Sequence, residues 1–144
     1  MNRIRVAAVA VGLAIDIVGS VVVGIAIGVA LVVLAAATGS LSPQHLLQTR
    51  TGLLPELLGL LGTTFFTGLG GYAAGLMARP HSLVNSLAVG LISLLLGVAL
   101  AILQPGATPL WKLVVGAAAT VPVALTGGWL ASLGGKRVLP GASG

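Results

Sequence analysis

Four long apolar runs, separated by short polar segments, make up most of this chain. They predict four helices at about residues 6–37, 55–78, 82–103 and 110–133. Because about 20 helical residues cross a membrane core, each run is long enough to span a bilayer. The runs do not alternate between apolar and polar positions, which excludes the strands of a lipid-facing barrel. The pattern therefore predicts an all-α protein with four transmembrane helices.

The polar segments carry turn and cap residues. Ser42-Pro43 predicts a short surface turn over 44–48, because serine caps helices and proline suits their first position. Residues 79–82 predict a tight turn between the second and third helices. The last segment, 134–144, is rich in glycine and polar residues and is expected to be a disordered tail.

A proline interrupts the fourth run. Pro122 is predicted to kink this helix. A kink of this kind is tolerated in lipid when a hydroxyl or a neighbouring helix meets the carbonyl that the proline frees. Thr120 or Thr126 is expected to supply that hydroxyl.

Composition indicates that lipid, and not water, surrounds this chain. Of the 144 residues, 57% are hydrophobic and only 6% are charged, whereas soluble domains carry roughly a quarter charged residues. The net charge of +5 comes without a basic run or an aromatic platform, which argues against a nucleic-acid partner. The chain has no cysteine, which excludes disulfides and thiolate metal sites. We expect one integral membrane domain over residues 1–144.

A cleaved signal peptide is the competing interpretation of the first run. It has a basic start and a small-residue segment, Ala35-Ala36-Ala37, that could be cleaved. Signal peptides use an apolar stretch of only about 7–15 residues, and this run is far longer. We therefore expect a first transmembrane helix at 6–37.

The cations predict an orientation. With four spans both termini share one side of the membrane, and the more cationic side is expected to be cytoplasmic. Five cations fall on the side of the termini and two on the other, so we expect both termini in the cytoplasm of a multi-pass cell-membrane protein. Aromatic residues near the span ends are expected to anchor at the two interfaces. The first side holds Arg3, Arg5, Arg79, Lys136 and Arg137, the second Arg50 and Lys112, and the anchors are Tyr72, Trp111 and Trp129.

The two halves of the chain resemble each other. Residues 70–79 match residues 127–136 in their glycines, their aromatic residue and their final cation. Residues 17–25 match residues 83–91 more loosely. Chance is the alternative, since Gly, Ala, Val and Leu dominate both halves. We expect two tandem helical hairpins, related by a pseudo-twofold axis along the membrane normal.

Small residues recur at a spacing of four in every predicted helix. Such faces let helix backbones approach closely in lipid, where no hydrophobic force draws helices together. We therefore expect the helices to pack as a compact bundle through these positions. The residues are Ser20, Gly24 and Gly28; Gly71 and Gly75; Ser86, Gly90, Ser93 and Gly97; and Gly128 and Ser132.

One stretch of the sequence carries a family resemblance. The pattern Gly-Gly-Tyr-x-Ala-Gly-x-x-Ala-Arg at 70–79 is followed by a short turn with a histidine and then by Asn-Ser-Leu-x-Val-Gly-Leu at 85–91. It resembles a group of uncharacterised small bacterial four-span membrane proteins, mainly over residues 65–97. The resemblance implies an inner-membrane location and no known activity, and no functional residues carry over from it.

Asp16 is the leading candidate for chemistry, because an acid inside a span is a proton or cation site by default. The repeat places it opposite Ser82, at the cytoplasmic end of its helix. The alternative is an interfacial acid paired with Arg79 or His81 at the same level. Asn85 is expected one turn deeper, where it could bond across helices or bind a ligand.

The sequence offers little for catalysis or for a bound metal or cofactor. His81 is more readily explained as a polar turn residue than as a catalyst. His45 and Glu56 could share the outer surface, but two groups do not complete a zinc site. We expect no enzyme activity, no metal and no cofactor.

Three functions stay open at this point. The first is a non-enzymatic protein that acts by helix association, as a homo-oligomer or an accessory subunit. Its rival is a small channel or transporter for a cation, a proton or a small solute, using Asp16, Asn85 and His81. The third is binding of anionic lipid headgroups by the cationic ends. Few polar residues lie deep in the spans, and their hydroxyls are expected to bond their own helices, which disfavours transport; they are Thr63, Thr64, Thr67, Ser93 and Thr120.

Overall fold

The structure is a computed structural model that describes residues 4–39, 42, 44, 52–104 and 108–134. Its long elements are all helices: α1 (Val6–Ala37), α3 (Leu53–Met77), α4 (Ser82–Leu103) and α5 (Leu110–Leu133). The second helix begins at Leu53, two residues before the predicted start. The predicted surface turn beyond Gln44, the tail beyond Gly134 and His45 lie outside the described residues. Of the seven cations that were used to predict orientation, three are described: Arg5, Arg79 and Lys112. The other four lie outside the described residues: Arg3, Arg50, Lys136 and Arg137.

All four helices are long and apolar enough to cross a membrane. Their large side chains point outward: Leu61, Leu95 and Ile25 are each more than half exposed. Most of the positions that are fully buried hold small residues such as Ala74 and Ser86. An apolar exterior around a core of small residues is the arrangement that lipid favours, and the chain is a multi-pass membrane protein.

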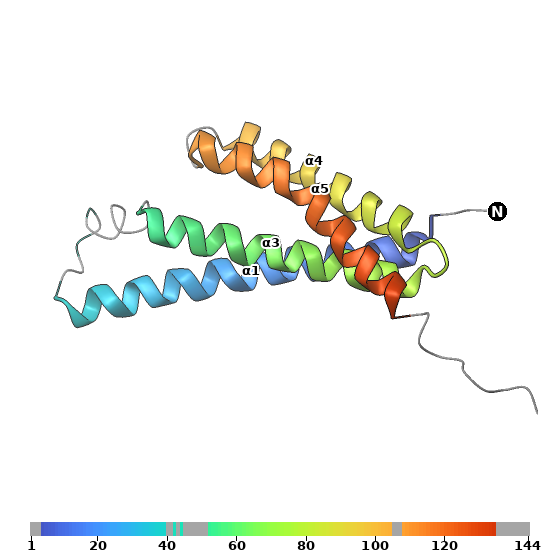
Figure 1. The fold of residues 1–144 in the computed structure, drawn as a ribbon. Coiled ribbons are helices and arrows are strands. Elements are labelled where there is room, and N and C mark those ends of the chain that lie inside the picture. The colour runs from blue at the N-terminus through green and yellow to red at the C-terminus, as the bar shows by residue number, and fades with distance from the viewer. Residues whose placement is uncertain (1–3, 40–41, 43, 45–51, 105–107, 135–144) are drawn as a thin grey trace, which may run out of the picture.

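The helices form two hairpins that cross at one end. α1 pairs with α3 and α4 pairs with α5, and the two pairs separate from each other toward the loops at residues 40–51 and 105–107 (Figure 1). We call the crossing end, where α1 begins and α5 ends, the closed end, and the opposite end the open end. Every pair of helices is in contact except α1 and α5.

Glycines make the crossing possible. A Cβ added at Gly70 would collide with the carbonyl oxygen of Gly12, and one added at Gly71 would collide with the carbonyl oxygen of Ala124. Any larger residue would push these backbones apart, which fixes the register of α1 and α5 against α3. By contrast, a Cβ added at Gly24 would meet nothing within 4 Å.

The α5 helix runs through Pro122 without ending. The predicted role of the neighbouring hydroxyls was wrong. Proline removes the partner of the carbonyl four residues earlier, at Ala118, whereas Thr120 donates to the carbonyl of Gly116 at 2.7 Å and Thr126 to that of Val123 at 2.7 Å. Both threonines therefore bond their own helix at other positions.

Candidate functional site

The side chain of Asp16 lies where three helices meet. It is 6% exposed and projects from α1 toward α3 and α4. The hydroxyl of Thr67 on α3 donates to one carboxylate oxygen at 2.7 Å, and the hydroxyl of Ser93 on α4 donates to the other. Both oxygens are thus engaged by hydroxyls from other helices, and no ion pair joins Asp16 to a cation in the described part of the chain.

Asp16 lies near the middle of the spans, which corrects the predicted interfacial position. Ser93 is eleven residues beyond the start of α4 at Ser82, or about 16 Å at the rise of an α-helix. The predicted pairing of Asp16 with Arg79 or His81 is therefore wrong. The repeat alignment failed because it left residues 6–15 outside the bundle.

The first turns of α1 are in fact packed inside the closed end. Ala8 and Val9 are buried, and Gly12 lies against Gly70. The backbone N–H of Arg5 bonds the Asn85 side chain on α4. With Arg5 held at the level of Asn85, eleven further residues of α1 carry Asp16 to mid-span.

Asn85 serves a different purpose from Asp16. It is fully buried, its side-chain oxygen accepts from the Arg5 backbone at 2.8 Å, and its amide donates to the carbonyl of His81 at 2.8 Å. It lies eight residues from Ser93 along α4, or about 12 Å. The structure therefore does not bring Asp16 and Asn85 together, and Asn85 joins the start of α1 to the turn before α4.

Two arginines form hydrogen bonds between segments at the closed end. Arg5 donates to the carbonyl of Met77 at 3.1 Å, and Arg79 donates to the carbonyl of Ala131 at 2.6 Å. Both acceptors lie near the C-termini of helices, where cations are favourable. His81 is half-buried at the turn between α3 and α4, directly before α4 begins. Arg79 and His81 thus belong to the closed end and not to the surroundings of Asp16.

A cleft runs from Asp16 to the open end between the two hairpins. Its inner part is a cavity of about 350 Å³ that includes Asp16, Ser20 and Thr64 in its lining. Its outer part is a cavity of about 470 Å³ that includes Lys112 and Leu113. Six residues line both cavities, so the two are continuous: Leu60, Thr63, Ser93, Gly97, Gly116 and Thr120.

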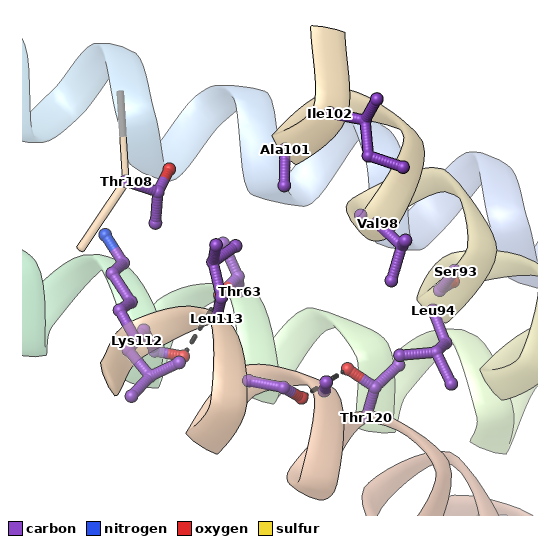
Figure 2. Close-up of a pocket in the computed structure, with 14 residues that line it drawn as sticks. Thr63, Ser93, Leu94, Val98, Ala101, Ile102, Thr108, Lys112, Leu113 and Thr120 are labelled. Atoms are coloured by element: carbon purple, nitrogen blue, oxygen red, sulfur yellow. Dashed lines mark hydrogen bonds between the residues drawn. The ribbon is translucent and has the colours of Figure 1, made fainter. Parts of the chain in front are cut away.

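Figure 2 shows the outer part of this cleft. Val98 and Ala101 of α4 point across it toward Leu113 and Lys112 of α5. The hydroxyl of Thr120 turns back to its own helix. The wall is therefore mainly aliphatic, with the Lys112 ammonium near the open end.

Charged groups are scarce along the whole cleft. Within the four helices the only charged side chains are Asp16, Glu56 and Lys112. Glu56 lies in the first turn of α3 and Lys112 in the first turn of α5, so both belong to the open end. Asp16 is the single charge of the helix interiors, at the inner limit of an apolar cleft.

The small residues of the sequence fall into two groups. Gly71, Gly75, Gly90, Gly128 and Ser86 lie in close contacts between helices, and the Ser86 hydroxyl donates to the Gly71 carbonyl at 2.6 Å. A Cβ added at Gly24, Gly28 or Gly97 would meet nothing within 4 Å, and Ser20 lines the inner cavity. Ser132 donates to the carbonyl of Trp129 in its own helix. The residues of close contact thus lie at the closed end, and the open positions lie toward the open end.

Close contacts also involve residues that the spacing argument missed. Gly12, Gly19, Gly70 and Gly127 leave no room for a Cβ against their neighbours. Gly127 faces the backbone of α3 at Gly68. The adjacent glycines at 70–71 and 127–128 were the available signal, since such pairs let one helix meet neighbours on two sides.

The predicted interface anchors are all exposed on the helix surfaces. Tyr72 and Trp111 are each 38% exposed, and Trp129 is 54% exposed. Among the described residues there is no group of three or more His, Cys, Asp and Glu side chains that could hold a metal ion. The arrangement around Asp16 is suited to binding a single positive charge or a proton.

Comparisons of the chain with known protein families, with curated proteins and with solved structures found no match. The resemblance to small bacterial four-span proteins therefore stays a prediction.

Proposed function

We propose that this protein binds and moves a cation or a proton across the membrane, with Asp16 as the binding group. The observation that carries the proposal is the buried carboxylate at mid-span, at the inner limit of the cleft. Placing an acid at this depth costs about 2.5–3.5 kcal/mol on insertion scales. A cost of that size is understandable when the acid has a function, and acids at such positions mark proton and cation pathways.

This proposal reverses the order of the first two of the three functions that the sequence left open. Transport was disfavoured because Asp16 was expected at the interface and the deep hydroxyls were expected to bond their own helices. The hydroxyls of Thr67 and Ser93 in fact donate across helices to Asp16. The helix interiors therefore contain one polar site shared by three helices.

The site can change its charge without leaving a buried group unpaired. The Thr67 hydroxyl lies 2.7 Å from the Asp16 carboxylate and 3.1 Å from the carbonyl of Thr63. When Asp16 gains a proton, Thr67 can donate to Thr63 and accept from the acid, because a hydroxyl both donates and accepts. This exchange of partners is what a site that loads and releases a positive charge requires.

The distribution of cations along the chain favours one orientation of the protein in the membrane. We place the protein in an inner membrane with the closed end and both termini in the cytoplasm, because five of the seven cations in the sequence precede the first helix, lie in the turn before the third or follow the fourth. The cleft then opens away from the cytoplasm. Two hairpins that repeat the same unit would move as two bodies about the closed end, with the pseudo-twofold axis along the membrane normal.

Flux into vesicles tests this function. The purified protein is reconstituted, a potential negative inside is set with potassium and valinomycin, and entry of protons or sodium is followed with a dye. The chain offers a matched control, since Glu56 is its only other acid. We expect flux from the wild type and from Glu56→Gln, and a loss of about tenfold or more from Asp16→Asn. Equal flux from all three proteins, or none from the wild type, would overturn the proposal.

Helix association is the second candidate, and one observation favours it. The face of α1 that carries Ser20, Gly24 and Gly28 has open positions at both glycines, although small faces of this type pack against other helices in lipid. In this case a second copy or a larger complex would cover α1. Crosslinking in bilayers tests it: Gly24→Leu should lower the dimer fraction and Ala26→Leu, which is exposed elsewhere on α1, should not.

A further inference from the structure

We infer that the cleft takes a lipophilic organic cation, a molecule with one positive charge on a bulky apolar body, and holds its charge at Asp16. This inference rests on the proposed function and names its substrate class. It follows from the chemistry of the walls, the supply of oxygen ligands and the route into the cleft.

The walls fit an apolar body. The inner cavity includes Ile17, Val21, Leu96 and Leu100 in its lining, and the outer cavity includes Val98 and Ile102. The cavity volumes of about 350 and 470 Å³ fall in the range of about 300–1,000 Å³ that holds drug-sized ligands. A molecule that fills this space gains dispersion contacts along its whole length.

The charge of the site selects the sign of the ligand. Asp16 is the only charged side chain of the inner cavity. No charged residue lies on α4, and those of α3 and α5 lie in their first turns at the open end. A cation at the inner limit of the cleft therefore meets one carboxylate and no competing charge.

The site is poor in oxygen ligands for a metal ion. Calcium takes six to eight oxygens and magnesium demands a near-ideal octahedron. The inner cavity offers one carboxylate and six hydroxyls, those of Ser20, Thr63, Thr64, Thr67, Ser93 and Thr120. Two of the six, on Thr63 and Thr120, donate to carbonyls of their own helices, and the carboxylate is the only charged oxygen ligand. The surrounding helices are continuous at this depth, so their backbone carbonyls are used within the helices. The exception is the carbonyl of Ala118, which Pro122 leaves without its helical partner, and Ala118 lines neither cavity. An organic cation needs only the charge and the apolar wall.

The route into the cleft also suits a molecule that dissolves in lipid. Ile17, Val21 and Leu100 line the inner cavity and are each about half exposed on the helix surfaces, so the cavity is open sideways to the bilayer. The Lys112 ammonium lines the outer cavity and repels small hydrated cations that approach along the axis of the cleft. A lipophilic cation can enter from the side and avoid it.

Binding of tetraphenylphosphonium tests this inference, with tetraphenylborate as an anion of the same shape. Wild-type protein in nanodiscs is compared with empty nanodiscs by equilibrium dialysis. We expect saturable binding of the phosphonium that is unchanged in Glu56→Gln and weakened about tenfold or more in Asp16→Asn. Tetraphenylborate should not distinguish the wild type from Asp16→Asn.

A second variant keeps the carboxylate and fills the cleft. Gly97 lines both cavities, and a Cβ there would meet nothing within 4 Å. Gly97→Leu should therefore fold, lose phosphonium binding, and still pass protons in vesicles. Phosphonium binding that is the same in the wild type, Asp16→Asn and Gly97→Leu would overturn the inference. If flux in vesicles still depends on Asp16, the proposed function survives that result, and if it does not, both fall.

Discussion

The hydroxyl of Thr67 on α3 donates to the carboxylate of Asp16 on α1 at 2.7 Å, although 51 residues separate them in the chain. The bond is buried and lies near the middle of two long apolar helices. This bond connects the two helices of the first hairpin, α1 and α3. The bond from Ser93 connects the same carboxylate to α4 of the second hairpin. One acid thus connects both halves of the molecule at the inner limit of the cleft.

Removing this donor should weaken the fold modestly. Thr67→Val keeps the shape of the side chain and deletes the hydroxyl, and hydrogen bonds between membrane helices contribute about 0.5–2 kcal/mol. We expect a loss of unfolding free energy of that size in a detergent titration. Thr120→Val is the control, because the Thr120 hydroxyl bonds only the carbonyl of its own helix. An equal loss in both variants would show that the bond to Asp16 adds nothing.

The glycine crossing should be intolerant of even one methyl group. In Gly71→Ala the new Cβ would collide with the carbonyl oxygen of Ala124, and overpacking of this type costs about 1–3 kcal/mol. The same titration measures it. Gly28→Ala is the matched control, since its Cβ would meet nothing within 4 Å, and it should be neutral or slightly stabilising, by up to about 1 kcal/mol. The account of the crossing fails if Gly71→Ala is as stable as the control.

Asn85 should matter for stability and not for cation binding. Asn85→Leu removes the bonds to the Arg5 backbone and to the His81 carbonyl, and an unpaired buried group costs about 1–3 kcal/mol. Because Asn85 lies about 12 Å from Ser93 along α4, we expect phosphonium affinity within about twofold of the wild type in the protein that stays folded. A loss of affinity as large as that of Asp16→Asn would assign Asn85 to the site after all.

Single cysteines can establish the orientation, because the chain has none of its own. His81→Cys marks the turn at the closed end, and Gln104→Cys marks the exposed C-terminus of α4 at the open end. In intact cells an impermeant thiol reagent should label position 104 and leave position 81 unlabelled until the membrane is opened. The reverse pattern would turn the cleft toward the cytoplasm.

The sequence was sufficient to predict the helices but not their register. Apolar runs of this length have few alternatives to a membrane helix, so the predicted bounds at 82–103 and 110–133 agree with α4 and α5. The depth of Asp16 was missed because it depends on which small residues meet. Gly12 against Gly70 sets that depth, and nothing in a one-dimensional pattern shows that residues 6–15 enter the bundle.

The partners of Asp16 were missed for a related reason. Hydroxyls in apolar helices commonly bond their own backbone, as Thr63 and Thr120 do. The Thr67 hydroxyl keeps a bond of this type, at 3.1 Å to the carbonyl of Thr63. Thr67 and Ser93 also donate to Asp16 because the crossing brings a carboxylate within their reach. Their special position is a property of the packing and not of their local sequence.

The most direct test of the central claim is the ratio of initial cation flux between Asp16→Asn and Glu56→Gln, reconstituted at equal density in the same vesicles. Each variant changes one carboxylate to an amide, and they differ in whether that group lies at the inner limit of the cleft or in the first turn of α3. The account predicts a ratio of about one tenth or less. A ratio near one would show that the mid-span carboxylate does not carry the positive charge.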